Sequence, residues 1–375
     1  MNATRRVAIA GVGYSDAGRR TGLSERHHAA QAAVRALSDA GLTTADVDGL
    51  TTWGGNPVDI AQMLGAMPLR WHLDVAVSPA FISPAIHASW AVATGQADVV
   101  LAMRVIMQQP SQANAAAGGP GMVFDAQFQH PFGDLIPAQW AGLLMNRYLH
   151  ESDATEDDFA RFAVVQRDYA ARNDEALMRD PLTAEEYLAA PYISKPLRLL
   201  DCDYPCDSGA AVVFTTEERA RDLPQKPVFV EATALSAIHD MNFELLPDMV
   251  RTAPVQCAQE LWSKTDLQVS DLDCAQLYDG FSLITFQWLE ALGACEPGQA
   301  GPFVRDGGTQ LGGALPTNTD GGACNVGRRH GANFCIEATR QLRGQGGTRQ
   351  VADAEVAVWA NAVGPFAGAM LLTNS

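Results

Sequence analysis

Cysteine sulfur is the first chemistry to consider, because all seven cysteines lie in the second half of the chain, beginning at Cys202. A thiol attacks as its thiolate, which forms readily only in an electropositive setting. Cys324 lies in a glycine-rich stretch near Arg328, which supplies such a setting only weakly. The odd number of cysteines argues against a disulfide framework. Because Cys202 and Cys206 lack a second pair or a histidine cluster at zinc-finger spacing, no metal site is predicted.

Tyrosine, arginine and histidine side chains offer proton-transfer chemistry instead. Tyr278 has an ordinary pKa near ~10, so it acts as an acid or a base at neutral pH only if a neighbour shifts that pKa. Arg328 would lower it, since a cation stabilises the phenolate. A tyrosine that ends a buried strand is more often a core residue, and His330 beside Gly331 could be an ordinary loop histidine. Residue types alone leave these interpretations open.

The acidic residues near these candidates are assigned to the backbone. Asp201, Asp203 and Asp207 are expected to cap a loop before a strand. Asp279, directly after Tyr278, is expected to fix its loop by Asx-type hydrogen bonds. None of the four is assigned to catalysis.

The whole-chain numbers exclude several functional classes. The 375 residues are 47% hydrophobic, which suits a large globular core. The net charge of -17 argues against sequence-independent nucleic-acid binding, which needs a basic surface. No stretch reaches the ~18 apolar residues of a membrane helix, and the N-terminus lacks the apolar region of a secretion signal. We therefore expect a cytoplasmic protein without a membrane span.

The N-terminal segment predicts a strand, a turn and a helix. Residues 7–10 form a short apolar run, and Gly11-x-Gly13 is interpreted as a turn, since a dinucleotide fingerprint would need a third glycine. Ser24 is the expected N-cap of the helix, which ends before Gly41. The apolar positions of this helix are mostly alanine, which suits close packing on a sheet.

The rest of the chain predicts two similar α/β halves. A helix near 85–92 precedes a buried strand at 98–103, and the second half repeats this alternation up to a last strand at 356–360. We place the N-terminal half at 1–222, with a loop or insertion region at about 110–195, and the C-terminal half at 223–375. The pattern is typical of a duplicated, layered α/β protein.

Several segments spread over nearly the whole chain resemble thiolases of the sterol-carrier-protein-X type. They are Ala40–Leu42 with Asp46–Leu50, Ile193–Val213, Tyr278–Ser282, Asn318–Gly322, and Gln341–Gly344 with Gln350–Val351. Their number, order and spacing make the resemblance specific. It implies the thiolase fold, in which duplicated βαβαβαββ halves form α-β-α-β-α layers.

The nucleophilic cysteine of that family is missing. The corresponding stretch, Ser78 to Ser83, reads SPAFIS, and the family's second cysteine is replaced within Asn361–Pro365. A serine hydroxyl without an evident base is a much poorer nucleophile than a thiolate. A covalent acyl-enzyme is therefore not expected.

The other altered positions resemble the steroid side-chain-cleaving aldolases of thiolase fold. Tyr278 stands where thiolases carry the histidine of an "HDCF"-like motif, and Arg328 stands where they carry a "GHP" histidine. Those aldolases have a second tyrosine near Arg328, two residues before a His-Gly pair; here His330-Gly331 is present and the tyrosine is not. The resemblance implies Tyr278 for proton transfer, His330 for oxyanion stabilisation or proton relay, and Arg328 as their catalytic neighbour.

The implied reaction is retro-aldol cleavage of a branched β-hydroxyacyl-CoA, from a steroid or bile-acid side chain, to a ketone and a short acyl-CoA. No cofactor is implied. The aldolases also imply a homodimer bound to a small OB-fold, zinc-containing acyl-CoA-binding protein in a heterotetramer. The candidate substrate-binding residues are Ser78, Ser83, Asn318, Gly321 and Gly322.

Two alternatives stay open. The chain could be a catalytically silent scaffold that binds acyl-CoA or lipid, because both sulfurs and one expected tyrosine are missing. It could also retain Claisen or acyl-transfer chemistry with Ser78, Ser83 or Cys324 as a relocated nucleophile.

Overall fold

The computed structural model describes residues 4–75, 79–108, 136–239, 246 and 248–375. The strands are β1 (Val7–Tyr14), β2 (Gly49–Thr52), β3 (Trp71–Asp74), β4 (Val99–Ile106), β5 (Tyr192–Ser194), β6 (Leu197–Arg198), β7 (Ser208–Thr216), β8 (Val228–Ala237), β9 (Cys274–Leu277), β10 (Val356–Val363) and β11 (Phe366–Thr373). The helices are α1 (Glu25–Asp39), α2 (Pro57–Leu64), α3 (Ile82–Ala93), α6 (Pro137–Glu151), α7 (Glu156–Ala171), α8 (Ala184–Ala189), α9 (Glu217–Arg221), α10 (Ala253–Trp262), α11 (Ser282–Leu292), α12 (Ala300–Arg305), α13 (Ala323–Val326) and α14 (Ala332–Leu342).

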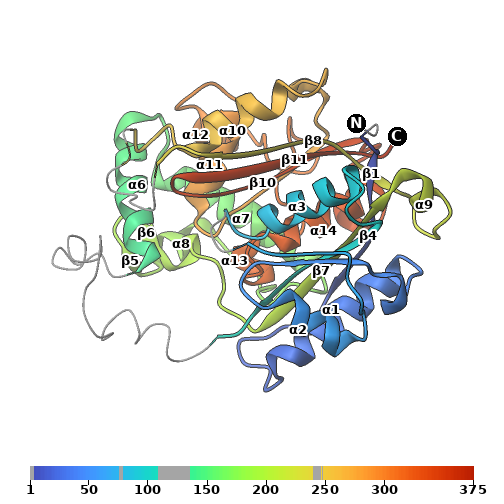
Figure 1. The fold of residues 1–375 in the computed structure, drawn as a ribbon. Helices are drawn as coiled ribbons and strands as arrows, with labels where there is room; N and C mark the ends of the chain where they lie inside the picture. The colour runs from blue at the N-terminus through green and yellow to red at the C-terminus, as the bar shows by residue number, and fades with distance from the viewer. Residues whose placement is uncertain (1–3, 76–78, 109–135, 240–245, 247) are drawn as a thin grey trace.

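Nine strands form one mixed sheet in the order β3-β2-β4-β7-β1-β8-β11-β10-β9. The sheet folds over at β1 and β8, which pair at only two positions. Helices α3 and α14 lie between its two parts, α1 and α2 cover the outer face of one part, and α10 to α12 cover the other (Figure 1). Three large clusters of buried apolar side chains fill the spaces between these layers. The predicted α-β-α-β-α arrangement is confirmed.

The two parts of the sheet repeat one topology. In the first, β2 runs parallel to β4, β4 antiparallel to β7, and β7 antiparallel to β1. In the second, β9 runs parallel to β10, β10 antiparallel to β11, and β11 antiparallel to β8. The duplication predicted from the sequence is therefore visible in the strand order.

The N-terminal helix was predicted correctly, but the turn before it was not. Ser24 caps α1 by accepting from the His27 backbone N–H, as predicted. Gly11 and Gly13, however, lie within β1, which runs on to Tyr14. A Cβ at Gly11 would lie 2.2 Å from the Ala36 carbonyl oxygen of α1. These glycines therefore allow a helix to pack closely on a strand, a role that looks identical to a turn in sequence.

The C-terminal hairpin was only half predicted. Strand β10 continues to Val363, and β11 pairs along its whole length after a two-residue connection. Strand β11 was not predicted because alanine and glycine open it, and these are weak strand signals. The small residues are required by packing, since a Cβ at Gly368 would lie 2.7 Å from the Ile82 side chain of α3.

This architecture brings the chemical candidates to the middle layer, where the two halves of the chain meet. Tyr278 directly follows β9, and His330 lies just before α14. Among the described residues, no helix is long and apolar enough to cross a membrane.

Candidate active site

Tyr278 is held firmly at the end of β9. Its backbone N–H donates to the Ala360 carbonyl of β10 at 2.9 Å, and its ring packs edge-to-face on Phe334 with centroids 6.2 Å apart. A Cβ at Gly280 would lie 2.4 Å from the tyrosine hydroxyl, so glycine leaves the space that the ring occupies. Tyr278 is only 6% exposed. Its hydroxyl is therefore fixed in a buried setting.

Asp203 and Arg328 complete a polar cluster with this hydroxyl. The Arg328 guanidinium donates through Nε to Asp203 Oδ1 at 2.8 Å, and its Nη2 lies 2.7 Å from the same oxygen. Burial raises the pKa of Asp203, while Arg328 and a hydrogen bond from the Tyr278 hydroxyl oppose that shift. Asp203 was predicted as a loop cap, and its ion pair with Arg328 and its electrostatic interaction with Tyr278 are findings of the structure.

The same surroundings set the protonation of Tyr278. Burial raises the pKa of Tyr278 well above 10, and the Asp203 carboxylate raises it further, whereas Arg328 lowers it. The effect of Arg328 was predicted correctly in sign. Burial and Asp203 outweigh it, which was not predicted, so the phenol is protonated at neutral pH.

Asp279 ties the Tyr278 loop to the glycine-rich loop. Its two carboxylate oxygens accept from the backbone N–H groups of Ala323 (2.7 Å) and Cys324 (3.5 Å). The predicted loop-fixing role is thus supported, although the partners lie across the fold and not within an Asx turn. Burial raises the pKa of Asp279 to about 7. The Cys324 thiol donates to the Asp279 carbonyl at 3.2 Å, and burial and the Asp279 carboxylate raise its pKa well above 9, which disfavours a thiolate.

His330 is held by both its backbone and its ring. Its φ angle of 48° is unusual for a residue other than glycine. Its carbonyl accepts from the Phe81 N–H at 3.0 Å and from Asn361 Nδ2 at 3.2 Å. Its ring packs edge-to-face on Trp53, and Arg104 Nε donates to its Nδ1 at 3.3 Å. Burial lowers the pKa of His330 well below 6.5, and the Arg104 and Arg328 cations lower it further, so the imidazole is neutral.

The described residues of the stretch that corresponds to the thiolase nucleophile include no activated nucleophilic side chain. Ala80, directly before the first turn leading into α3, has a φ angle of 68° but only a methyl side chain. Ser83 is buried in α3, and the His87 ring bonds its backbone carbonyl at 2.8 Å and not its hydroxyl. Ser78 lies outside the described residues.

The glycine-rich loop residues have partners inside the chain. The Asn318 side chain accepts from the Leu277 N–H (2.6 Å) and donates to the Leu277 carbonyl (2.7 Å). A Cβ added at Gly321 would lie 2.6 Å from the Ala170 side chain. One added at Gly322 would lie 2.1 Å from an Asp279 carboxylate oxygen. These contacts support the β9 end that carries Tyr278. The prediction that these three residues bind substrate remains untested.

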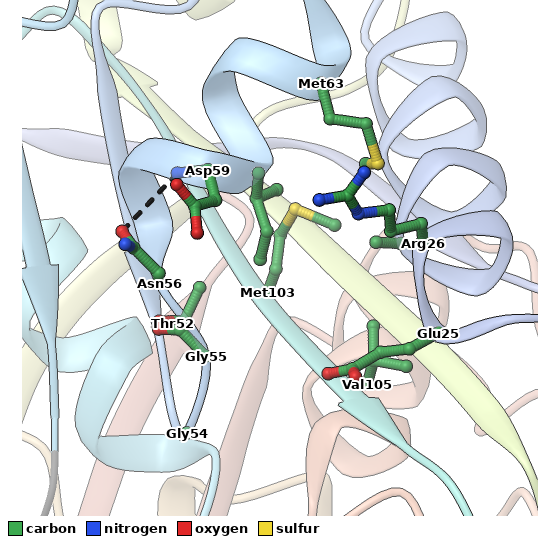
Figure 2. Close-up of a pocket in the computed structure, with 12 residues that line it drawn as sticks. Glu25, Arg26, Thr52, Gly54, Gly55, Asn56, Asp59, Met63, Met103 and Val105 are labelled. Atoms are coloured by element: carbon green, nitrogen blue, oxygen red, sulfur yellow. Dashed lines mark hydrogen bonds between the residues drawn. The ribbon is translucent and has the colours of Figure 1, made fainter.

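A separate cavity of about 170 Å³ lies beneath β4, between α1 and α2 (Figure 2). Met103 and Val105 line it together with Met63, Asn56 and other residues. Because successive side chains of a strand point to opposite faces, Arg104 faces away from this cavity. The cavity is therefore distinct from the cluster around Tyr278.

Comparisons with known proteins show which family this chain resembles. Residues 236–372 match the family model described as thiolase C-terminal domain-like. The 17-hydroxy-3-oxo-4-pregnene-20-carboxyl-CoA lyase of Mycobacterium tuberculosis is 36% identical over 358 residues, which cover 90% of this chain and 92% of that protein. The steroid side-chain-cleaving aldolase of Thermomonospora curvata is 35% identical over 359 residues, with 90% of each chain covered. The solved structure of the Ltp2-ChsH2(DUF35) aldolase matches 99% of this chain and 98% of its own, with a TM-score of 0.92 at 33% identity.

Proposed function

We propose a reaction for this chain from the premise that it belongs to the steroid side-chain-cleaving aldolases of the thiolase superfamily. It is a carbon–carbon lyase that cleaves a branched β-hydroxyacyl-CoA by a retro-aldol reaction. The products are a ketone and a shorter acyl-CoA. The observation that carries this function is the largely buried cluster of Tyr278, Asp203 and Arg328, which can move a proton without a covalent intermediate.

The proton path begins at the β-hydroxyl of the substrate. Tyr278 is a protonated phenol, so it can accept the substrate proton only as it passes its own proton to Asp203. The bond between the α and β carbons then breaks, its electron pair enters the thioester enolate, and the β carbon becomes the ketone carbonyl. The enolate takes a proton at its α carbon from the Tyr278–Asp203 pair. No net proton is consumed, and Tyr278 and Asp203 return to their initial states.

The enolate oxygen needs a hydrogen-bond donor that does not also compete for the transferred proton. His330 meets this requirement because its imidazole is neutral and is held rigidly. One such donor is commonly worth about 3 kcal/mol at a transition state. We therefore assign His330 to oxyanion stabilisation, in preference to the alternative of proton relay.

The proposed assembly follows the relatives. The similar solved structure is named as an Ltp2-ChsH2 aldolase with a DUF35 component. We propose that this chain forms a homodimer and binds a small OB-fold, zinc-containing acyl-CoA-binding partner in the cytoplasm. The reaction itself requires only the acyl-CoA substrate and no cofactor.

The test is a purified reaction with a tertiary β-hydroxyacyl-CoA, with and without a DUF35 partner, followed by mass spectrometry of the ketone. Tyr278→Phe should lower kcat by about 10²–10⁴-fold, as expected for loss of an acid–base group. The exposed Tyr192→Phe serves as the matched control and should keep the wild-type rate. No ketone in the presence of the partner, or an unimpaired Tyr278→Phe enzyme, would reject the proposal. Tight acyl-CoA binding without turnover would instead support the scaffold alternative.

A further inference from the structure

Arg104 is a partly buried cation next to His330 that the sequence did not reveal as a candidate. It lies in β4, and its guanidinium donates through Nη1 to the Trp53 carbonyl and, at 3.4 Å, to the Gly54 carbonyl. It also stacks over the Trp53 ring, with the guanidinium carbon 4.5 Å from the ring centre. These contacts hold the guanidinium in place, so its Nε–H points at His330 Nδ1 in a fixed orientation.

The bond between Arg104 and His330 determines where the imidazole proton lies. A guanidinium N–H can only donate, so His330 Nδ1 must be the acceptor. A neutral imidazole with an accepting Nδ1 carries its single proton on Nε2. The edge-to-face packing on Trp53, with ring centroids 4.8 Å apart, and the bond from Arg104 hold the ring in this orientation. Nε2 is therefore a fixed hydrogen-bond donor.

Among the described residues, no carboxylate lies within ion-pair distance of Arg104. The acidic groups that act on it are the more distant Glu25 and Asp74, together with Tyr278. A cation that is shielded from water and lacks a counterion stabilises an anion that forms nearby, and the enolate of the proposed reaction is such an anion.

We infer that Arg104 is a positioning residue that fixes the Nε2–H tautomer of His330 and directs this N–H to the thioester enolate oxygen. The inference rests on the proposed function for the identity of the anion. The tautomer itself is a property of the ligand-free protein and can be measured without turnover.

The chain contains its own control for that measurement. The His87 ring bonds the Ser83 carbonyl through Nδ1 at 2.8 Å. Since a carbonyl only accepts, neutral His87 must carry its proton on Nδ1. In a ¹⁵N-histidine-labelled sample at a pH where both rings are neutral, His330 should show the Nε2–H tautomer and His87 the Nδ1–H tautomer. His330→Asn and His87→Asn variants assign the two signals.

Arg104→Met removes the donor to Nδ1. The His330 signals should then move to a mixture of tautomers, while those of His87 stay unchanged. With the partner and a β-hydroxyacyl-CoA, kcat should fall by about 10–10²-fold with little change in KM, less than the loss of a whole oxyanion donor. Arg104→Lys should recover part of kcat, and Arg221→Met, which changes an arginine whose side chain is 59% exposed, should match wild type.

Two results would overturn the inference. One is a wild-type His330 with its proton on Nδ1, which needs no variant and so does not depend on Arg104→Met folding. The other is a folded Arg104→Met protein with an unchanged His330 tautomer. If the tautomers are as expected but no ketone forms, the proposed function fails and the assignment of the Arg104–His330 bond stands.

Discussion

Replacement of Asp203 by asparagine tests the proton path most directly. The asparagine side chain would keep the size of the aspartate and could still contact Arg328 through its oxygen. It could not take up a proton from Tyr278, because an amide is not a base at neutral pH. The proposed path therefore loses its final acceptor while the shape of the cluster is kept.

The expected losses of kcat and of stability distinguish a catalytic role of Asp203 from a structural one. Loss of acid–base catalysis costs about 10²–10⁴-fold in kcat, or about 3–5 kcal/mol of barrier. Breaking a buried ion pair costs about 3–5 kcal/mol of stability, but the Arg328 side chain is 31% exposed and can be partly solvated by water. We therefore expect a smaller destabilisation of about 1–3 kcal/mol. With an unfolding entropy of about 2.1 cal/mol/K per residue, a chain of 375 residues should lose about 1–4 °C in Tm.

The assay compares kcat and Tm for Asp203→Asn and for Asp201→Asn. Asp201 is an equally buried neighbour, but its Oδ1 accepts from the hydroxyls of Tyr187 (2.7 Å) and Ser282 (2.5 Å) and not from Tyr278. Both variants should lose stability, but only Asp203→Asn should lose the expected kcat. An Asp203→Asn enzyme with near wild-type kcat, or equal losses in both variants, would refute the proton path. If Tyr278 and Asp203 act as one unit, the double variant with Tyr278→Phe should be no slower than the worse single variant.

The loops around Tyr278 give three further predictions. The pKa of Asp279 is raised from 3.8 to about 7, so its protonated form stabilises the fold fully below pH ~4, and this stability is lost as pH rises through 7. Asp279→Asn should reduce this pH dependence of the free energy of unfolding, which amounts to about 4 kcal/mol. Denaturant unfolding at pH 4 and pH 8 measures it. Asn318→Ala removes both bonds to Leu277 and should lower stability by about 1–3 kcal/mol in the same measurement; an unchanged KM indicates a supporting role, and a raised KM indicates substrate binding. Cys324→Ser should keep turnover, and intact-mass spectrometry of the wild-type protein should show no acyl adduct, whereas an adduct lost in Cys324→Ser would establish a relocated nucleophile.

The sequence predicted the fold better than its details, for a physical reason. Alternation of apolar helices and strands, together with the ordered motifs, was enough to predict duplicated layers. It was not enough to distinguish a glycine that forms a turn from one that admits a neighbouring helix. Gly11 and Gly13 belong to the second kind, and Ala36 of α1 lies where their side chains would be.

The sequence yielded candidate residues where they stand in motifs, and it yielded none where only the fold brings residues together. Tyr278, Arg328 and His330 stand in recognisable motifs. Asp203 bonds a residue 125 positions away, and Arg104 bonds one 226 positions away. A single sequence carries no signal for such pairs. The net rise of the Tyr278 pKa was not predicted for the same reason, since the sequence shows neither the burial of Tyr278 nor its proximity to Asp203.

The acidic surroundings of Tyr278 also explain why a thiolate is disfavoured at Cys324. A thiolate needs neighbouring positive charge or N–H donors, whereas Asp203 and Asp279 place two carboxyl groups in one buried cluster. Their effect is visible at Cys324, whose pKa both of them raise beyond the effect of burial. In the proposed reaction, the Asp203 that adds to burial in keeping Tyr278 protonated also supplies the base that the phenol needs. The acidic groups that the proposed proton transfer uses therefore also keep the Cys324 thiol protonated, which argues against a relocated sulfur nucleophile at this position.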